Sequence, residues 1–90
     1  MADENTAMLF AWGNAVVNAA SGAGFPMPAL GNSGELKDFV GWGRQVNAAA
    51  GGMITLPALA EDADYGAALG WAKSLDGQAR AMLPGLPELP

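Results

Sequence analysis

The sequence predicts an all-α protein, with three helices formed by three tandem repeats of about 30 residues, each a helix followed by a proline-containing extended connector. Two markers recur at this period: a tryptophan among apolar residues, and a proline followed two positions later by leucine. The markers are Trp12, Trp42 and Trp71, and Pro28, Pro57 and Pro87. We therefore predict one domain over residues 1–90, divided as 1–31, 32–60 and 61–90. It should form a compact three-helix bundle, or else a short open stack.

Composition supports a folded chain with an unusual surface. Hydrophobic residues make up 51% of the sequence and charged residues only 14%, the opposite of the balance that keeps a chain disordered. There is no cysteine and no histidine, so disulfides, thiolate metal sites and the commonest metal ligand are excluded. We expect no cofactor. Such a low charge indicates that part of the outer surface is covered by another molecule.

The first helix is predicted near Glu4 to Ala20. No charged residue occurs between Asn5 and Gly34, which raises the question of a membrane span. Asparagines, prolines and a high alanine content make this stretch a poor candidate for insertion. The chain opens with Asp3 and Glu4 instead of the positive charge typical of a signal peptide. We expect no signal peptide and no membrane insertion, with a location in the cytoplasm or within a virion or other assembly.

The second and third helices are predicted at about Glu35 to Ala50 and Asp62 to Met82. Asn32 and Glu35 have the spacing of a capping box, and Asp62 is a candidate N-cap. Small residues at 21–24 and 51–52 should terminate the first two helices. The connectors that follow are apolar and contain proline, which favours extended backbone in the preceding residue.

Each helix carries apolar residues three before, at, and four after its tryptophan, which places them on one helical face. The residue after each tryptophan is small: Gly13, Gly43 and Ala72. Glycine inside a helix is unfavourable, so its recurrence predicts a close approach by a neighbouring backbone.

The tryptophans allow two interpretations. They could form the core of the bundle, or they could anchor a partner, since tryptophan is enriched in interface hot spots. The residues two before each tryptophan are also apolar, and a small bundle cannot easily bury so wide a stripe on three helices. The predicted partner-binding residues are Trp12, Trp42, Trp71, Phe10, Val40, Leu69, Phe25, Met27, Leu30, Ile54, Leu56, Leu59, Leu86 and Leu89.

These features favour a non-enzymatic structural or assembly protein that docks onto a protein partner or larger complex. A minor virion component, such as a capsid or tail accessory subunit, is the most concrete form of this hypothesis, and homo-oligomerisation stays open. Nucleic acid is not an expected partner, because the net charge is −5 and only four residues are Lys or Arg.

Two alternatives remain. The first is a small acidic inhibitor that binds and blocks a host protein through a basic surface, although the acidic residues are spread over three helix starts. The second is an enzyme with an unrecognised site built from Lys37, Lys73 and Asp38. The serines have no histidine to activate them, and no spacing argues for catalysis.

Overall fold

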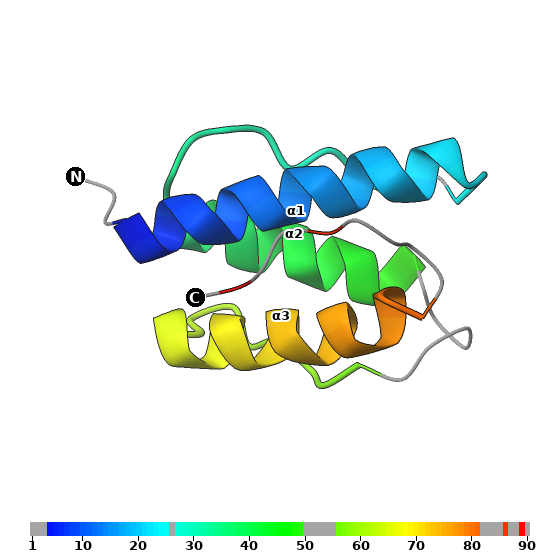
Figure 1. The fold of residues 1–90 in the computed structure, drawn as a ribbon. Helices are drawn as coiled ribbons and strands as arrows, with labels where there is room; N and C mark the ends of the chain where they lie inside the picture. Colours follow the sequence, from blue (N-terminus) through cyan, green and yellow to red (C-terminus); the bar gives the residue numbers. More distant parts are fainter. Residues whose placement is uncertain (1–3, 26, 50–55, 82–85, 87–88, 90) are drawn as a thin grey trace.

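A computed structural model describes residues 4–25, 27–49, 56–81, 86 and 89 of the chain. It contains three helices, α1 (Glu4–Gly22), α2 (Leu36–Ala49) and α3 (Tyr65–Ala79), and the described residues form no strand. Each helix contacts the other two around a single core (Figure 1). The prediction of an all-α three-helix bundle is confirmed.

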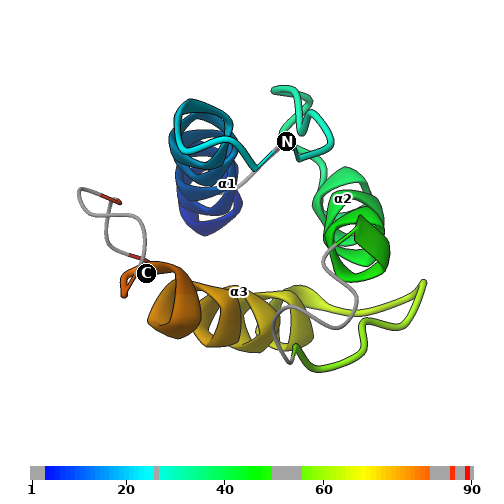
Figure 2. The ribbon, with the colours of Figure 1, turned by 90° about the vertical axis from the view of Figure 1, so that its right-hand side faces the viewer.

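All three helices run in the same direction, from left to right in Figure 1, and the described residues of the first connector run back from right to left to the start of α2. In Figure 2, α1 and α2 are seen almost end-on, and α3 passes below both of them at an angle. This arrangement brings the three helix starts to one end of the molecule. The acidic residues there, which include Glu4, Asp38 and Asp64, therefore gather at that end and are not scattered as the sequence suggested.

Helix α1 ends in a glycine-dependent cap, as residues 21–24 predicted. Gly24 has φ of 88°, a left-handed conformation that side-chain-bearing residues rarely adopt. The Phe25 N–H donates to the Ala20 carbonyl at 2.8 Å, and the Gly24 N–H donates to the Ser21 carbonyl at 3.2 Å. This pair of bonds is the Schellman arrangement, and it satisfies carbonyls that the helix leaves open.

The start of α2 differs from the predicted capping box. The Asn32 side-chain oxygen accepts from Asn14 of α1 at 3.1 Å, so it is committed to a contact between elements. Ser33 takes the local role instead: its hydroxyl accepts from the Glu35 N–H and donates to Asp38. The Asn32–Glu35 prediction is therefore wrong, because Asn32 is held by another helix.

Helix α3 is shorter than predicted. Its N-cap is Asp64, whose side chain accepts from the Ala67 N–H at 2.8 Å. The predicted cap, Asp62, lies in a turn closed by the Ala63 N–H and the Ala60 carbonyl. The helix ends at Ala79, before the predicted end at position 82, which lies outside the described residues.

The predicted apolar face forms the core. Every residue three before, at, and four after a tryptophan is at most 3% exposed. These residues are Leu9, Trp12, Val16, Phe39, Trp42, Val46, Ala68, Trp71 and Leu75. Phe10 and Val40 are buried as well, so the expectation that a small bundle cannot bury the wide stripe is wrong for α1 and α2. Connector leucines such as Leu59 also belong to this core and shield it from solvent.

The small residue after tryptophan has a different cause from the one predicted. A methyl group added at Gly13 would lie 2.5 Å from Cδ2 of Leu30, and one added at Gly43 would lie 2.5 Å from Cδ1 of Leu59. The close neighbour is thus a connector leucine side chain and not a backbone. Leu30 and Leu59 therefore each pack onto the helix that precedes them in the chain.

Candidate functional site

The three tryptophans belong to an aromatic cluster centred on Phe39. The Phe39 ring centroid lies 5.5 Å from that of Trp42, 6.1 Å from that of Trp71 and 6.5 Å from that of Trp12. Trp42 meets the other two indoles edge-on, at 88° and 85°. Such edge-to-face contacts stabilise beyond the burial of area, so these rings serve the fold.

Each indole N–H has a hydrogen-bond acceptor on another element. The bonds run from Trp12 to Asp76 Oδ1 at 3.0 Å, from Trp71 to Asn47 Oδ1 at 2.8 Å and from Trp42 to the Pro28 carbonyl at 2.7 Å. Together they connect α1 to α3, α3 to α2, and α2 to the first connector. Within the described part of the chain, no buried side-chain nitrogen or oxygen lacks a partner, so the core offers no spare polar group to a ligand.

Two of these acceptors, Asn47 and Asp76, have a second role that sequence reasoning missed. Asn47 also donates to the Pro57 carbonyl at 3.1 Å, and Asp76 Oδ2 accepts from Arg80 at 2.7 Å. A signal was present in the sequence, because Asn47 and Asp76 occupy the same position relative to Trp42 and Trp71. A polar residue recurring at the edge of an apolar face indicates a partner for the indole N–H.

The predicted partner-binding residues fall into three groups by exposure. Those buried in the chain's own core are Trp12, Trp42, Trp71, Phe10, Val40, Leu59 and Leu86. Those half-buried against it are Met27, Leu30, Leu56, Leu69 and Leu89. Phe25 is 44% exposed, and Ile54 lies outside the described residues. The buried group is unavailable to a partner of the folded chain, whereas the half-buried group is partly exposed and Phe25 is exposed.

Over α1 and the first connector, the solvent-exposed surface of the molecule is largely uncharged. Both views place this segment on one side of the bundle, opposite α3 (Figures 1 and 2). No Asp, Glu, Lys or Arg occurs from Asn5 to Gly34. We call the exposed residues of this segment the uncharged side: Asn5, Ala7, Met8, Ala11, Asn18, Ser21, Gly22, Ala23, Gly24, Phe25, Ala29, Gly31, Asn32 and Ser33.

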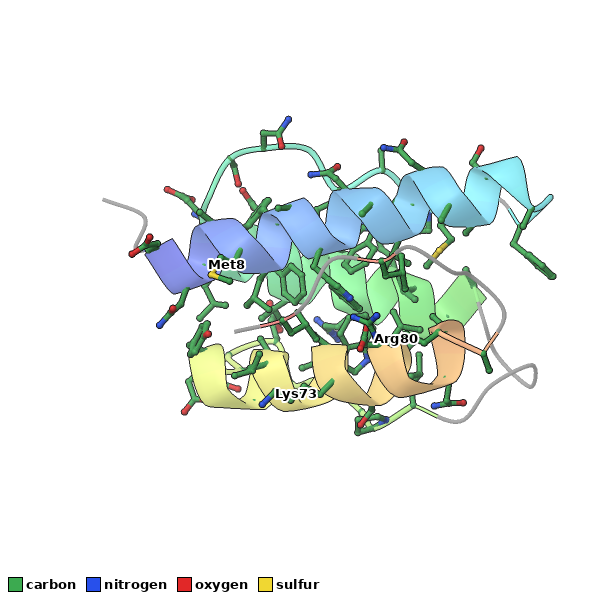
Figure 3. The ribbon with its side chains drawn as sticks, viewed as in Figure 1. Met8, Lys73 and Arg80 are labelled. Atoms are coloured by element: carbon green, nitrogen blue, oxygen red, sulfur yellow. The ribbon has the colours of Figure 1, made fainter. Side chains whose placement is uncertain are left out.

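Apart from Glu4 at the start of α1, the charged side chains that the structure describes lie on or next to α2 and α3. Figure 3 shows Met8 on α1, Lys73 on α3, and Arg80 at the residue that follows α3. Within the described part of the chain, Met8 and Phe25 are the exposed large hydrophobic residues, 41% and 44% exposed, and they lie near the two ends of α1. Among the described residues, those from Asn5 to Gly34 therefore carry no charge, whereas α2 and α3 carry both signs.

The residues considered for catalysis do not converge. Lys37 Nζ lies 3.5 Å from Glu35 Oε2, but their side chains are 79% and 61% exposed, so water screens the pair. Asp38 accepts from Ser33, and Lys73 lies exposed on α3 (Figure 3). No cluster of three acidic, histidine or cysteine side chains suited to a metal ion occurs among the described residues.

The helices that the structure describes are too short or too polar to cross a membrane. No known protein family, curated protein or solved structure matches this chain.

Proposed function

We propose that this chain is a non-catalytic assembly protein that docks its uncharged side onto a larger protein complex. The observation that carries the proposal is the separation of charge between α1 with its connector and the rest of the bundle. The central parts of protein interfaces are depleted in charged residues. A minor virion component, such as a capsid or tail accessory subunit, is the concrete form of this function.

Docking through the uncharged side costs little desolvation of charged groups. Covering the outer face of α1 removes no ionised group from water except at Glu4, on the edge of the helix. The exposed alanines leave the helix surface flat, and Met8 and Phe25 supply the larger apolar contacts. Because the bundle already satisfies its own core, docking needs no unfolding.

Two matched alanines provide a direct test. Ala11 lies exposed on α1 within the uncharged side, and Ala48 lies exposed on α2. A photo-reactive amino acid at each position, introduced in cells of the natural source, should cross-link a defined protein from position 11 but not from position 48. With the photo-reactive amino acid placed at Asn18 instead, also on the uncharged side, Ala11→Lys should abolish the cross-link. Ala48→Lys should leave it unchanged. Equal labelling from positions 11 and 48, or an unaffected cross-link in Ala11→Lys, would refute the proposal.

The acidic end of the bundle favours a second candidate, a small inhibitor of a host protein. The parallel helices bring Glu4, Asp38 and Asp64 to one end, and a basic partner surface would complement them. Ionic strength separates the two functions. Binding through the acidic end should weaken steeply as salt rises, whereas docking through the uncharged side should not.

A further inference from the structure

The outer face of α1 carries exposed residues from one end of the helix to the other. Ala7, Ala11, Asn18 and Gly22 are exposed at spacings of four, seven and four residues, which places them on one line along the helix. The fold does not use this line for its own packing. A methyl group added at Gly22 would meet nothing within 4 Å, and the side-chain amide of Asn18 makes no hydrogen bond within the described part of the chain.

The middle of this face is free of charge, unlike the middle of the other two helices. Lys73 is exposed near the middle of α3 (Figure 3), and Arg44 is exposed near the middle of α2. A two-fold contact is formed by the same patch on both molecules, so an axis through either helix would bring one of these side chains close to its own copy. In a chain of net charge −5, α1 is the helix of the bundle whose middle avoids such repulsion.

The exposed line of α1 is also symmetric along the helix. Its spacing is the same from either end, and its centre lies between Asn14 and Ala15, close to the middle of the helix. Two copies of α1 that run in opposite directions therefore place Ala7 against Gly22 of the second copy, and Ala11 against Asn18 of the second copy. Each such pair contains at least one alanine or glycine, so the two helices can approach closely.

The larger side chains at the ends of α1 favour the same antiparallel direction. Met8 and Phe25 lie near opposite ends of the helix, so antiparallel pairing brings Met8 of one copy towards the end that carries Phe25 of the other, where sulfur and ring can contact. The single charged residue of α1, Glu4, would lie about 30 Å from its own copy at a rise of about 1.5 Å per residue, well beyond the Debye length of roughly 8 Å. Parallel pairing would instead set the two carboxylates side by side.

We propose that α1 is a dimerisation helix, and that the partner of the uncharged side is a second copy of this chain whose α1 lies antiparallel to the first. The charge-free middle of the face, its symmetric line of small residues, and the positions of Met8 and Phe25 together carry the inference. It rests on the proposed function and makes that function more specific, because it names the protein that the uncharged side binds.

Disulfide cross-linking tests the pairing, because the chain has no cysteine of its own. Ala7→Cys and Gly22→Cys each place one thiol at an exposed position, and the space around Gly22 admits a side chain. When the two variants are mixed at millimolar concentration in a glutathione redox buffer, the mixed disulfide should exceed either symmetric disulfide by at least about tenfold, because pairing holds the two thiols at a high effective concentration. Ala48→Cys, exposed on α2, should give only the statistical mixture with either variant.

A long charged side chain in the paired face should separate the two copies. Ala11→Lys, added to both cysteine variants, should reduce the mixed disulfide to the level of the statistical mixture, because it replaces a small side chain where the helices meet. Ala48→Lys should leave the mixed disulfide unchanged. A mixed disulfide that forms no more than the symmetric ones, or that Ala11→Lys does not reduce, would overturn the inference.

Photo-cross-linking from position 11 in cells separates this inference from the proposed function. A covalent dimer of the chain supports both. A product with a different protein supports the proposed function but identifies another occupant of the uncharged side, and so overturns the inference. Absence of any product refutes the proposed function, whereas the disulfide experiment on the purified chain still decides whether α1 pairs with its own copy.

Discussion

Replacement of Gly43 by alanine tests how closely a connector leucine, Leu59, packs against α2. Gly43 is buried in α2, and the added methyl carbon would lie 2.5 Å from Leu59 Cδ1 and 3.5 Å from two atoms of the Trp71 ring. Favourable carbon–carbon contacts lie at about 3.5–4.0 Å, so Leu59 would have to move by about 1 Å. Leu59 is itself only 8% exposed and is held by the core, which opposes that movement.

Two opposing effects set the change in the free energy of unfolding that Gly43→Ala causes. Alanine is about 1 kcal/mol better than glycine in a helix, whereas overpacking of a core costs about 1–3 kcal/mol. We therefore expect Gly43→Ala to change the free energy of unfolding by between about zero and 2 kcal/mol in the destabilising direction. Gly41 is the matched control in the same helix, because an added methyl there meets nothing within 4 Å. Gly41→Ala should stabilise the chain by up to about 1 kcal/mol.

Chemical denaturation of both variants measures the difference, which isolates the steric cost because the helix-propensity gain is common to both. A difference of about 1–3 kcal/mol is expected. The double variant Gly43→Ala with Leu59→Ala should show no such cost, since the obstructing side chain is gone, and a double-mutant cycle reports this as coupling. If Gly43→Ala stabilises as much as Gly41→Ala, Leu59 does not occupy the space over Gly43, and the close packing described between them is wrong.

Substitutions of other interior residues should lower the free energy of unfolding, which equilibrium unfolding experiments measure. Asp76→Ala should cost about 1–3 kcal/mol because it leaves the indole N–H of Trp12 without an acceptor, whereas Asp76→Asn, which keeps an oxygen there, should cost less. Asn47→Ala should cost at least as much as Asp76→Ala, since it removes both an acceptor for Trp71 and a donor; a cost near zero would exclude this role. Phe39→Ala should cost about 3–5 kcal/mol, because four aromatic rings surround it, and an effect below 1 kcal/mol would contradict its central position.

Periodicity predicted the core well because each helix obeys it independently. The offsets around Trp12, Trp42 and Trp71 identify the buried face without any knowledge of how the helices meet. The glycine-rich end of α1 was predictable for the same reason, since its cap uses only neighbouring residues. These are features that local sequence determines.

Features that depend on contacts between elements were not predictable. Asn32 looks like a helix cap until Asn14 of α1 is brought beside it, and Asp62 looks like one until the turn that contains it is known. The interpretation of the tryptophans as partner anchors assumed that three helices leave much of the apolar stripe uncovered. Leucines of the connectors, such as Leu59, supply cover that helix periodicity alone does not reveal.

The composition of α3 gives this helix a low intrinsic stability. It contains Gly66, Gly70 and Gly77, all exposed, and a methyl added at the last two would meet nothing within 4 Å. Each exposed glycine costs a helix about 1 kcal/mol relative to alanine, and no internal packing requires Gly70 or Gly77. Helix α3 therefore depends on its Asp64 cap and on the core it shares with α1 and α2. A helix of low intrinsic stability is the part of the bundle where opening costs least.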